Sequence, residues 1–216
     1  ILIFPFEDHS YFRGTWDIRQ GIPRLLGELL KTESVAVLPV DTISTFFSGG
    51  EDITALSEDQ VLHIGRAAGA DLVLTGDILN FSIKRFNLGN RLFGGFTSYT
   101  ALVEVEIYLL RALSGARSGG AIQGKAEARD EGLGLTLLGK PTRREDMLAE
   151  LNDVPFGVER FQATIIGKVT LEALQQISAE IKARISSPRA MRQQTPKVLS
   201  IEGDQGFVNL GVADEI

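Results

Sequence analysis

The sequence predicts an α/β fold, in which a mixed β-sheet is flanked by helices and followed by a partial β module. Short apolar strands alternate with amphipathic helices over residues 2–81. Two strands of alternating polarity follow at residues 99–110 and 122–129. A long amphipathic helix over residues 161–185 completes the order β-α-β-α-β-β-β-α, which is typical of helices packed on a sheet.

The first elements follow from short apolar patterns. A strand is expected at residues 2–6, with residues 7–10 as the polar loop at its end. Leucine and isoleucine then recur at helical spacing from Gly21 onward, and Pro23 fits this helix in its first turn, where its missing N–H has no helical partner. A second strand is expected at residues 35–40, and residues 42–56 form a polar connection.

The next helix carries start and stop signals. Ser57 and Gln60 have the spacing of a capping box, which satisfies two backbone N–H groups at the helix start. Gly69 can adopt the left-handed conformation that ends a helix. Residues 72–79 are apolar on both sides, so we expect a central strand that is covered on both faces.

The second half predicts a hairpin and a covering helix. Residues 99–110 and 122–129 each place apolar side chains on one face and charged side chains on the other, so they should pair as antiparallel strands. The helix over residues 161–185 has the largest apolar face in the chain and should cover the sheet.

Three segments define the expected domain organisation. Residues 1–187 form the α/β domain, and residues 188–196 form a linker with little apolar content. Residues 197–216 form a β-hairpin that turns at Gly203 and Asp204. Because two strands cannot hold a core alone, this hairpin either docks on the main domain or begins a module that continues past Ile216, and we favour the second.

Composition excludes several classes of protein. The 216 residues are 44% hydrophobic with a net charge of -6, and this acidic balance disfavours nucleic acid as a partner. No apolar run approaches the roughly 20 residues of a membrane-spanning helix. The absence of cysteine removes disulfides and thiolate chemistry.

The sequence predicts neither an enzyme nor a cofactor or metal site. Residues 134–142 have the glycine spacing and the lysine, Lys140, of a phosphate-binding loop, but Pro141 replaces the required Ser or Thr. His9 and His63 are the only histidines, and a metal site on either would need carboxylates whose grouping the sequence does not show. Asp77 lies inside an apolar strand, where backbone groups or Thr75 are its expected partners.

The aromatic, glycine-rich segment at residues 86–99 is the candidate surface for binding a partner. Its apolar residues have little periodic order, so they either pack on their own domain or form an exposed patch that docks a protein or a membrane surface. The candidate binding residues are Phe86, Leu92, Phe93, Phe96 and Tyr99.

Several of these segments together resemble a bacterial envelope family. They are ILIFPF at residues 1–6, GADLVLTGD at residues 69–77, the hairpin containing residues 104–114, and the long closing helix. The chain is similar here to the family that includes the curli secretion lipoprotein CsgG, the penicillin-binding protein activator LpoB and the N-terminal domain of TolB. Residues 198–211 additionally resemble the start of the C-terminal domain of the flagellar ring protein FlgT.

The resemblance implies a non-catalytic protein-binding scaffold in an envelope assembly such as a secretion, flagellar or cell-wall machine. It implies a periplasmic location, with a lipid-anchored or peripheral contact with the outer membrane, protein partners and a homo-oligomeric ring. A signal peptide ending at a lipidated cysteine upstream of Ile1 would fix this location, and the sequence does not show whether one precedes it.

Two alternatives remain open. One is a curli-type outer-membrane secretion pore, for which the family implies barrel hairpins at residues 83–98 and 123–158. The second of these regions offers only small residues such as Ala126 and Ala128 on its apolar side, which disfavours a lipid-facing barrel strand. The other alternative is a phosphate-handling enzyme around Lys140.

Overall fold

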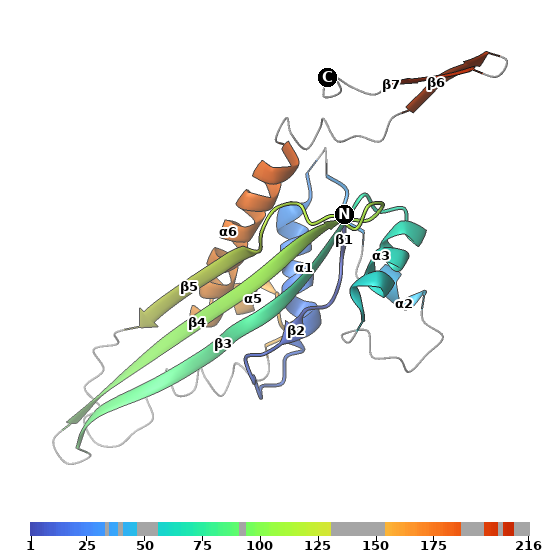
Figure 1. Ribbon diagram of the computed structural model, residues 1–216. Helices are drawn as coiled ribbons and strands as arrows, with labels where there is room; N and C mark the ends of the chain where they lie inside the picture. Colours follow the sequence, from blue (N-terminus) through green and yellow to red (C-terminus); the bar gives the residue numbers. More distant parts are fainter. Residues whose placement is uncertain are drawn as a thin grey trace. The chain divides into compact units, whose positions relative to one another are not determined.

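The computed structural model describes residues 1–32, 35–38, 41–46, 56–90, 94–130, 154–186, 197–202 and 205–209 (Figure 1). The chain divides into two compact units, Ile1–Ser178 and Ala179–Ile216. In the second unit, β6 (Lys197–Glu202) and β7 (Gln205–Asn209) pair antiparallel, so the two strands of the expected hairpin are present. The turn predicted at Gly203 and Asp204 lies outside the described residues. The linker at residues 188–196 lies outside the described residues, and the proposed domain boundary stays a prediction.

The first unit is built on a mixed β-sheet, as the sequence predicts. Its strands are β1 (Leu2–Ile3), β2 (Glu7–Asp8), β3 (Leu72–Asn90), β4 (Gly94–Arg111) and β5 (Ile122–Asp130). They lie in the order β1-β3-β4-β5, with β2 also paired to β3. β1 and β2 run parallel to β3, whereas β4 is antiparallel to both β3 and β5. Helices flank this sheet, so the α/β class is confirmed.

The first strand is shorter than predicted because Pro5 interrupts it. Proline has no N–H to donate to a ladder, and the chain forms β1 before Pro5 and β2 after it. Glu7 and Asp8, which the sequence assigned to a loop, therefore belong to a strand. The N–H of Phe4 still donates to the carbonyl oxygen of Leu74 at 2.9 Å, which ties the interrupted segment to β3.

Helix α1 (Ile18–Leu30) begins before Gly21, so Pro23 does not lie in its first turn. Proline at this position cannot donate to the carbonyl oxygen of Arg19, the acceptor four residues earlier. The N–H of Phe6 fills that role instead, donating to Arg19 at 3.0 Å. The helix tolerates Pro23 because the segment beside β2 supplies the missing donor.

The second strand predicted at residues 35–40 is wrong for the part that the structure describes. Leu38 forms only an isolated bridge with Leu2, and Val35 forms another with Thr32. Pro39 has no N–H to extend such a bridge into a ladder. The polar connection that follows contains a short helix, α2 (Asp41–Ser44).

Helix α3 (Glu58–Ala67) confirms both of its sequence signals. The N–H of Ser57 donates to Gln60 Oε1 at 2.9 Å, and the N–H of Gln60 donates to Ser57 Oγ at 3.3 Å, which completes the capping box. Gly69 follows the helix with a φ of +70°, in the left-handed region.

The two faces of the sheet are covered to different extents. We call the face that carries Ile107 the inner face, and helices α1 and α6 (Ile165–Ser186) lie on it (Figure 1). Among the described residues, the opposite, outer face is covered at one end, where Val61 and Ile64 of α3 pack in a core cluster with Val73. The central strand is thus buried on both sides there, but not along its whole length.

A β-bulge in β3 changes which residues point outward. The pairing with β4 shifts between Ile78 and Asn80, which leaves Leu79 without a partner residue. Before the bulge Asp77 lies on the outer face, and after it Asn80 does, while Ile78 and Phe81 are both buried. Leu79 itself is 37% exposed, which the apolar run at residues 72–79 did not suggest.

The closing helix is broken where the sequence predicts one continuous element. It consists of α5 (Glu159–Gln162) and α6, and Thr164 caps α6 by accepting the N–H of Gly167 at 3.0 Å. The predicted coverage of the sheet is confirmed: a Cβ added at Gly124 would lie 2.3 Å from the carbonyl oxygen of Ala173, so helix and strand touch through backbone atoms.

Side chains also join α6 to its neighbours. The side-chain amide of Gln176 accepts the N–H of Lys125 and donates to its carbonyl oxygen, both at 3.1 Å. Ser178 Oγ donates to the carbonyl oxygen of Leu29 at the end of α1, at 3.2 Å. Among the described residues, no helix is both long enough and apolar enough to cross a membrane.

Candidate functional site

The segment predicted to bind a partner is a continuous two-stranded ribbon. β3 and β4 stay paired as far as Asn90 and Gly94, whereas the ladder between β4 and β5 ends at Tyr99 and Asp130. The ribbon therefore continues beyond the end of β5, as Figure 1 shows. The described part of the chain places no third strand beside this extension.

The five candidate binding residues occupy different parts of this hairpin. Phe86 lies in β3 opposite Ser98, and Phe96 lies in β4 opposite Leu88. Leu92 and Phe93 lie outside the described residues.

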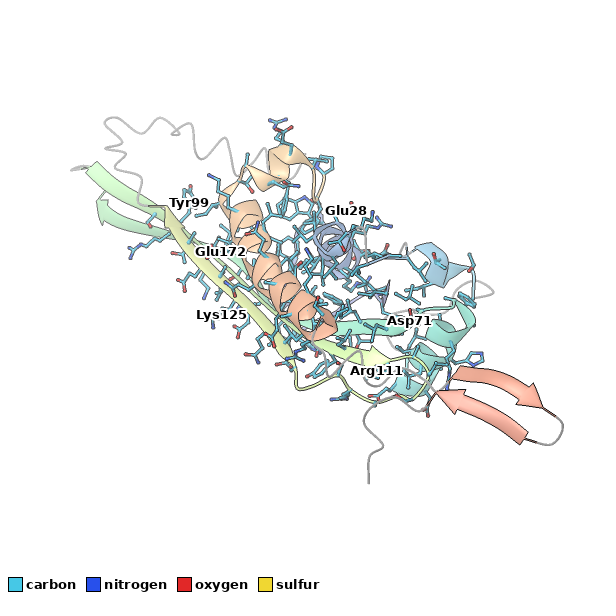
Figure 2. All side chains as sticks on the ribbon, turned by 90° about the horizontal axis from the view of Figure 1, so that it is seen from above. Glu28, Asp71, Tyr99, Arg111, Lys125 and Glu172 are labelled. Carbon is cyan, nitrogen blue, oxygen red and sulfur yellow. The ribbon has the colours of Figure 1, made fainter. Side chains whose placement is uncertain are left out.

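The side chain of Tyr99 is buried, with 5% of its surface exposed. It pairs with Arg85 on one side and Asp130 on the other, and Figure 2 shows it toward the opposite end of the sheet from Asp71 and Arg111. Its hydroxyl group has no hydrogen-bond partner among the described residues. Tyr99 thus marks the base of the ribbon.

A row of polar side chains crosses the outer face. Glu7 of β2, Asp77 of β3, Glu106 of β4 and Gln123 of β5 are successive cross-strand partners. Three of these four side chains are carboxylates on adjacent strands, an arrangement that is unfavourable unless hydrogen bonds or cations compensate it.

The negative charge of the Glu106 carboxylate is compensated by two hydrogen bonds. It accepts one from the hydroxyl of Tyr108 and one from Gln123 Nε2, the latter at 2.6 Å. The bond from Tyr108, followed by that from Gln123, lowers the pKa of Glu106, and the same bond with Glu106 raises the pKa of Tyr108.

Tyr108 also connects the row to helix α3. The guanidinium carbon of Arg117 lies 5.0 Å from the centre of the Tyr108 ring, and Arg117 Nη2 lies 3.0 Å from Glu58 Oε2. Arg117 therefore links the first turn of α3 to the outer face through a charged contact and a cation–π contact.

Glu7 and Asp77 instead converge on a histidine. His9 Nε2 lies 3.5 Å from Glu7 Oε2 and 3.4 Å from Asp77 Oδ1. The sequence marked Asp77 as a polar residue in an apolar strand, but its partner is His9, which was assigned to a loop. The missed signal is the spacing of Glu7 and His9, which places both side chains on one face of an extended chain.

The described residues of this unit form at least two cavities. The larger, about 740 Å³, lies along α1 and is bordered by Trp16 and Phe156, with Arg24 and Glu28 among its charged residues. The smaller, about 200 Å³, lies on the outer face beside the polar row. Thr75, Glu7, Asp77 and Tyr108 are among the residues that line it.

The larger cavity adjoins a cluster of aromatic rings that belongs to the core. Trp16 makes edge-on contacts with Phe81, Phe156 and Phe161 at centroid distances of 6.3, 5.9 and 5.1 Å. Trp16 Nε1 donates to the carbonyl oxygen of Val154 at 2.7 Å. These contacts account for the aromatic side chains as packing between the strands and α5.

The phosphate-loop candidate cannot be placed, since residues 134–142 with Lys140 lie outside the described residues. His63, the second histidine, is exposed on α3.

No protein-family model matches the chain, and no curated protein matches it. Among solved structures it is similar to a hypothetical protein from Chlamydia trachomatis, with 13% identity over 85% of this chain and 96% of that one and a TM-score of 0.44. A lipoprotein from Neisseria meningitidis shares 15% identity over 71% of this chain and 97% of that one, with a TM-score of 0.39. The LpoB C-terminal domain from Salmonella enterica shares 13% identity over 59% and 79%, with a TM-score of 0.37. These are distant likenesses, and they assign no activity to this chain.

Proposed function

We propose that this protein is a non-catalytic component of a bacterial envelope assembly that binds protein partners through the β3–β4 ribbon. The proposal includes a periplasmic location, with contact with the outer membrane, and assembly with further copies. The envelope assignment is supported by the resemblance of residues 1–6 and 69–77 to the CsgG, LpoB and TolB N-terminal family.

The observation that supports the binding role is that β3 and β4 extend further than β5. A two-stranded ribbon without a third strand or a packed helix is marginally stable in water. In the described part of the chain no further strand pairs with its two edges, whose backbone N–H and C=O groups can therefore pair with another chain. A ribbon that extends past Tyr99 and Asp130 is therefore suited to become ordered against a partner.

Site-specific photo-cross-linking in cells tests this role. A benzophenone amino acid at Phe86 or Phe96 should give discrete cross-linked products with envelope proteins or with further copies of the chain. The same probe at Tyr11, an aromatic residue of the first unit that is 87% exposed, is the matched control and should give few products. Equal products from all three positions would contradict a binding role for the ribbon.

A shortened chain separates binding from folding. Because Arg85 and Tyr99 are cross-strand partners, a two-residue Asn-Gly turn can replace residues 86–98 between them. The shortened chain should retain its circular dichroism spectrum and lose the partner captured through the ribbon. Retention of that partner by the folded, shortened chain would place the binding surface elsewhere.

A further inference from the structure

The contact between Glu7, His9 and Asp77 is held by backbone pairing on two adjacent strands. Glu7 and Asp77 are register partners in the parallel pair of β2 and β3. The N–H of His9 donates to the carbonyl oxygen of Ile78 at 3.0 Å, which fixes the chain directly after β2. The side chains of Glu7 in β2, Asp77 in β3 and His9 directly after β2 therefore meet without depending on a long loop.

The distances from His9 Nε2 to the two carboxylate oxygens match the spacing of ligands around one metal ion. A charge-assisted hydrogen bond from histidine to a carboxylate has a length of about 2.7–2.9 Å. His9 Nε2 instead lies at nearly equal, longer distances from the two carboxylate oxygens, 3.5 and 3.4 Å. Four donors bound tetrahedrally at about 2.0–2.1 Å from zinc are about 3.3 Å from one another.

The charge around His9 also favours a cation. Glu7, Asp77 and Glu106 form one cross-strand row, and only Glu106 has the hydrogen bonds from Tyr108 and Gln123. A divalent ion held by His9 and the other two carboxylates would offset the repulsion within this row.

Access to the three side chains is open. The Glu7 and His9 side chains are 56% and 53% exposed and that of Asp77 is 26% exposed. Glu7 and Asp77 also line the cavity of about 200 Å³, which leaves room for water or another ligand at the remaining coordination positions. The three donor atoms lie within 4.8 Å of one another, so small side-chain movements suffice to close on an ion.

We propose that Glu7, His9 and Asp77 form a binding site for one divalent transition-metal ion. One imidazole nitrogen with two carboxylates is a donor set that suits zinc, whereas an oxygen-only set would suit calcium or magnesium. The site lies at the start of the sheet and is separate from the ribbon assigned to partner binding.

Calorimetric titration of the full chain with zinc chloride in a non-chelating buffer tests the site. The parent chain should bind one zinc ion. Because the loss of even an outer-shell partner costs about 10–100-fold in metal affinity, His9→Ala should weaken binding at least about tenfold. Asp77→Asn keeps the shape of the side chain and should also weaken binding.

His63→Ala is the matched control, since His63 is the other histidine of the chain and lies exposed on α3. This variant should bind zinc as the parent does. In heteronuclear NMR spectra of the imidazole groups, zinc should shift the His9 signals and leave those of His63 in place. Absence of binding by the parent chain, or unchanged binding by His9→Ala, would overturn the proposal, as would an equal loss with His63→Ala.

Discussion

The two faces of the sheet use the same strands but are stabilised in different ways. On the inner face Ile107 of β4 and Ile122 of β5 are fully buried, and Gly124 meets the backbone of α6. On the outer face the neighbouring residues Glu106 and Tyr108 are partly exposed and joined by hydrogen bonds and charged contacts. Alternate residues of one strand therefore stabilise the sheet through different kinds of interaction.

This difference indicates where the chain tolerates change. The stability that the inner face contributes depends on close packing. When a buried methylene group is removed, no water replaces the contacts that are lost. The outer face depends on polar pairs that water partly replaces when one partner is removed. Folding should therefore be more sensitive to substitutions on the inner face than to substitutions on the outer face.

Adjacent substitutions in β4 give the strongest test of this comparison. Ile107→Ala should lower the free energy of unfolding by about 2–5 kcal/mol, because it opens a cavity under the helices. Tyr108→Phe removes one hydrogen bond on the outer face and should cost no more than about 1 kcal/mol. Urea denaturation followed by circular dichroism measures both values, and similar costs would show that the two faces do not differ as described.

A pair of glycine substitutions tests the close approach on the inner face. Gly124→Ala places a Cβ against the carbonyl oxygen of Ala173 and should lower the free energy of unfolding by about 1–3 kcal/mol through overpacking. Gly120→Ala is the matched control, because a Cβ there meets no atom within 4 Å, and it should change stability by less than about 0.5 kcal/mol. Equal melting temperatures for the two variants would argue against backbone contact between β5 and α6.

The smallest expected effect concerns the titration of Glu106 on the outer face. Its pKa is lowered by the hydrogen bonds from Tyr108 and Gln123, so it stabilises the fold above the pKa of an unfolded glutamate. This contribution is lost as the pH falls through the lowered pKa. Tyr108→Phe removes the largest cause, and the pKa of Glu106 should move up toward its ordinary value.

Carboxyl carbon NMR shifts measured against pH check this prediction. An unchanged midpoint for Glu106 in Tyr108→Phe would mean that the tyrosine hydroxyl does not control this carboxyl group.

Local signals predicted much of the fold correctly because they act within a few residues. The Ser57–Gln60 capping box and the left-handed Gly69 depend only on their own helix, and both are present. The alternation of residues 99–110 and 122–129 likewise reports which face of each strand is buried. The envelope function that the family resemblance implies remains a proposal.

Features that depend on a distant neighbour could not be predicted in this way. Pro23 lies deeper in α1 than expected because the N–H of Phe6 satisfies the carbonyl oxygen of Arg19. His9 and Asp77 meet only because β2 pairs parallel with β3, and the sequence assigned β2 to a loop. The strands of the ribbon beyond Tyr99 were not predicted, because glycines interrupt the alternation of apolar and polar residues that indicates a strand.

The contact of Gln176 with Lys125 has a consequence for association between chains. Along the described part of β5, this single side chain occupies both backbone groups that Lys125 directs away from β4. An exposed strand edge is a template for pairing with another chain and for aggregation. At this position one side-chain amide of the helix takes the place of a neighbouring strand, so growth of the sheet past Lys125 is obstructed.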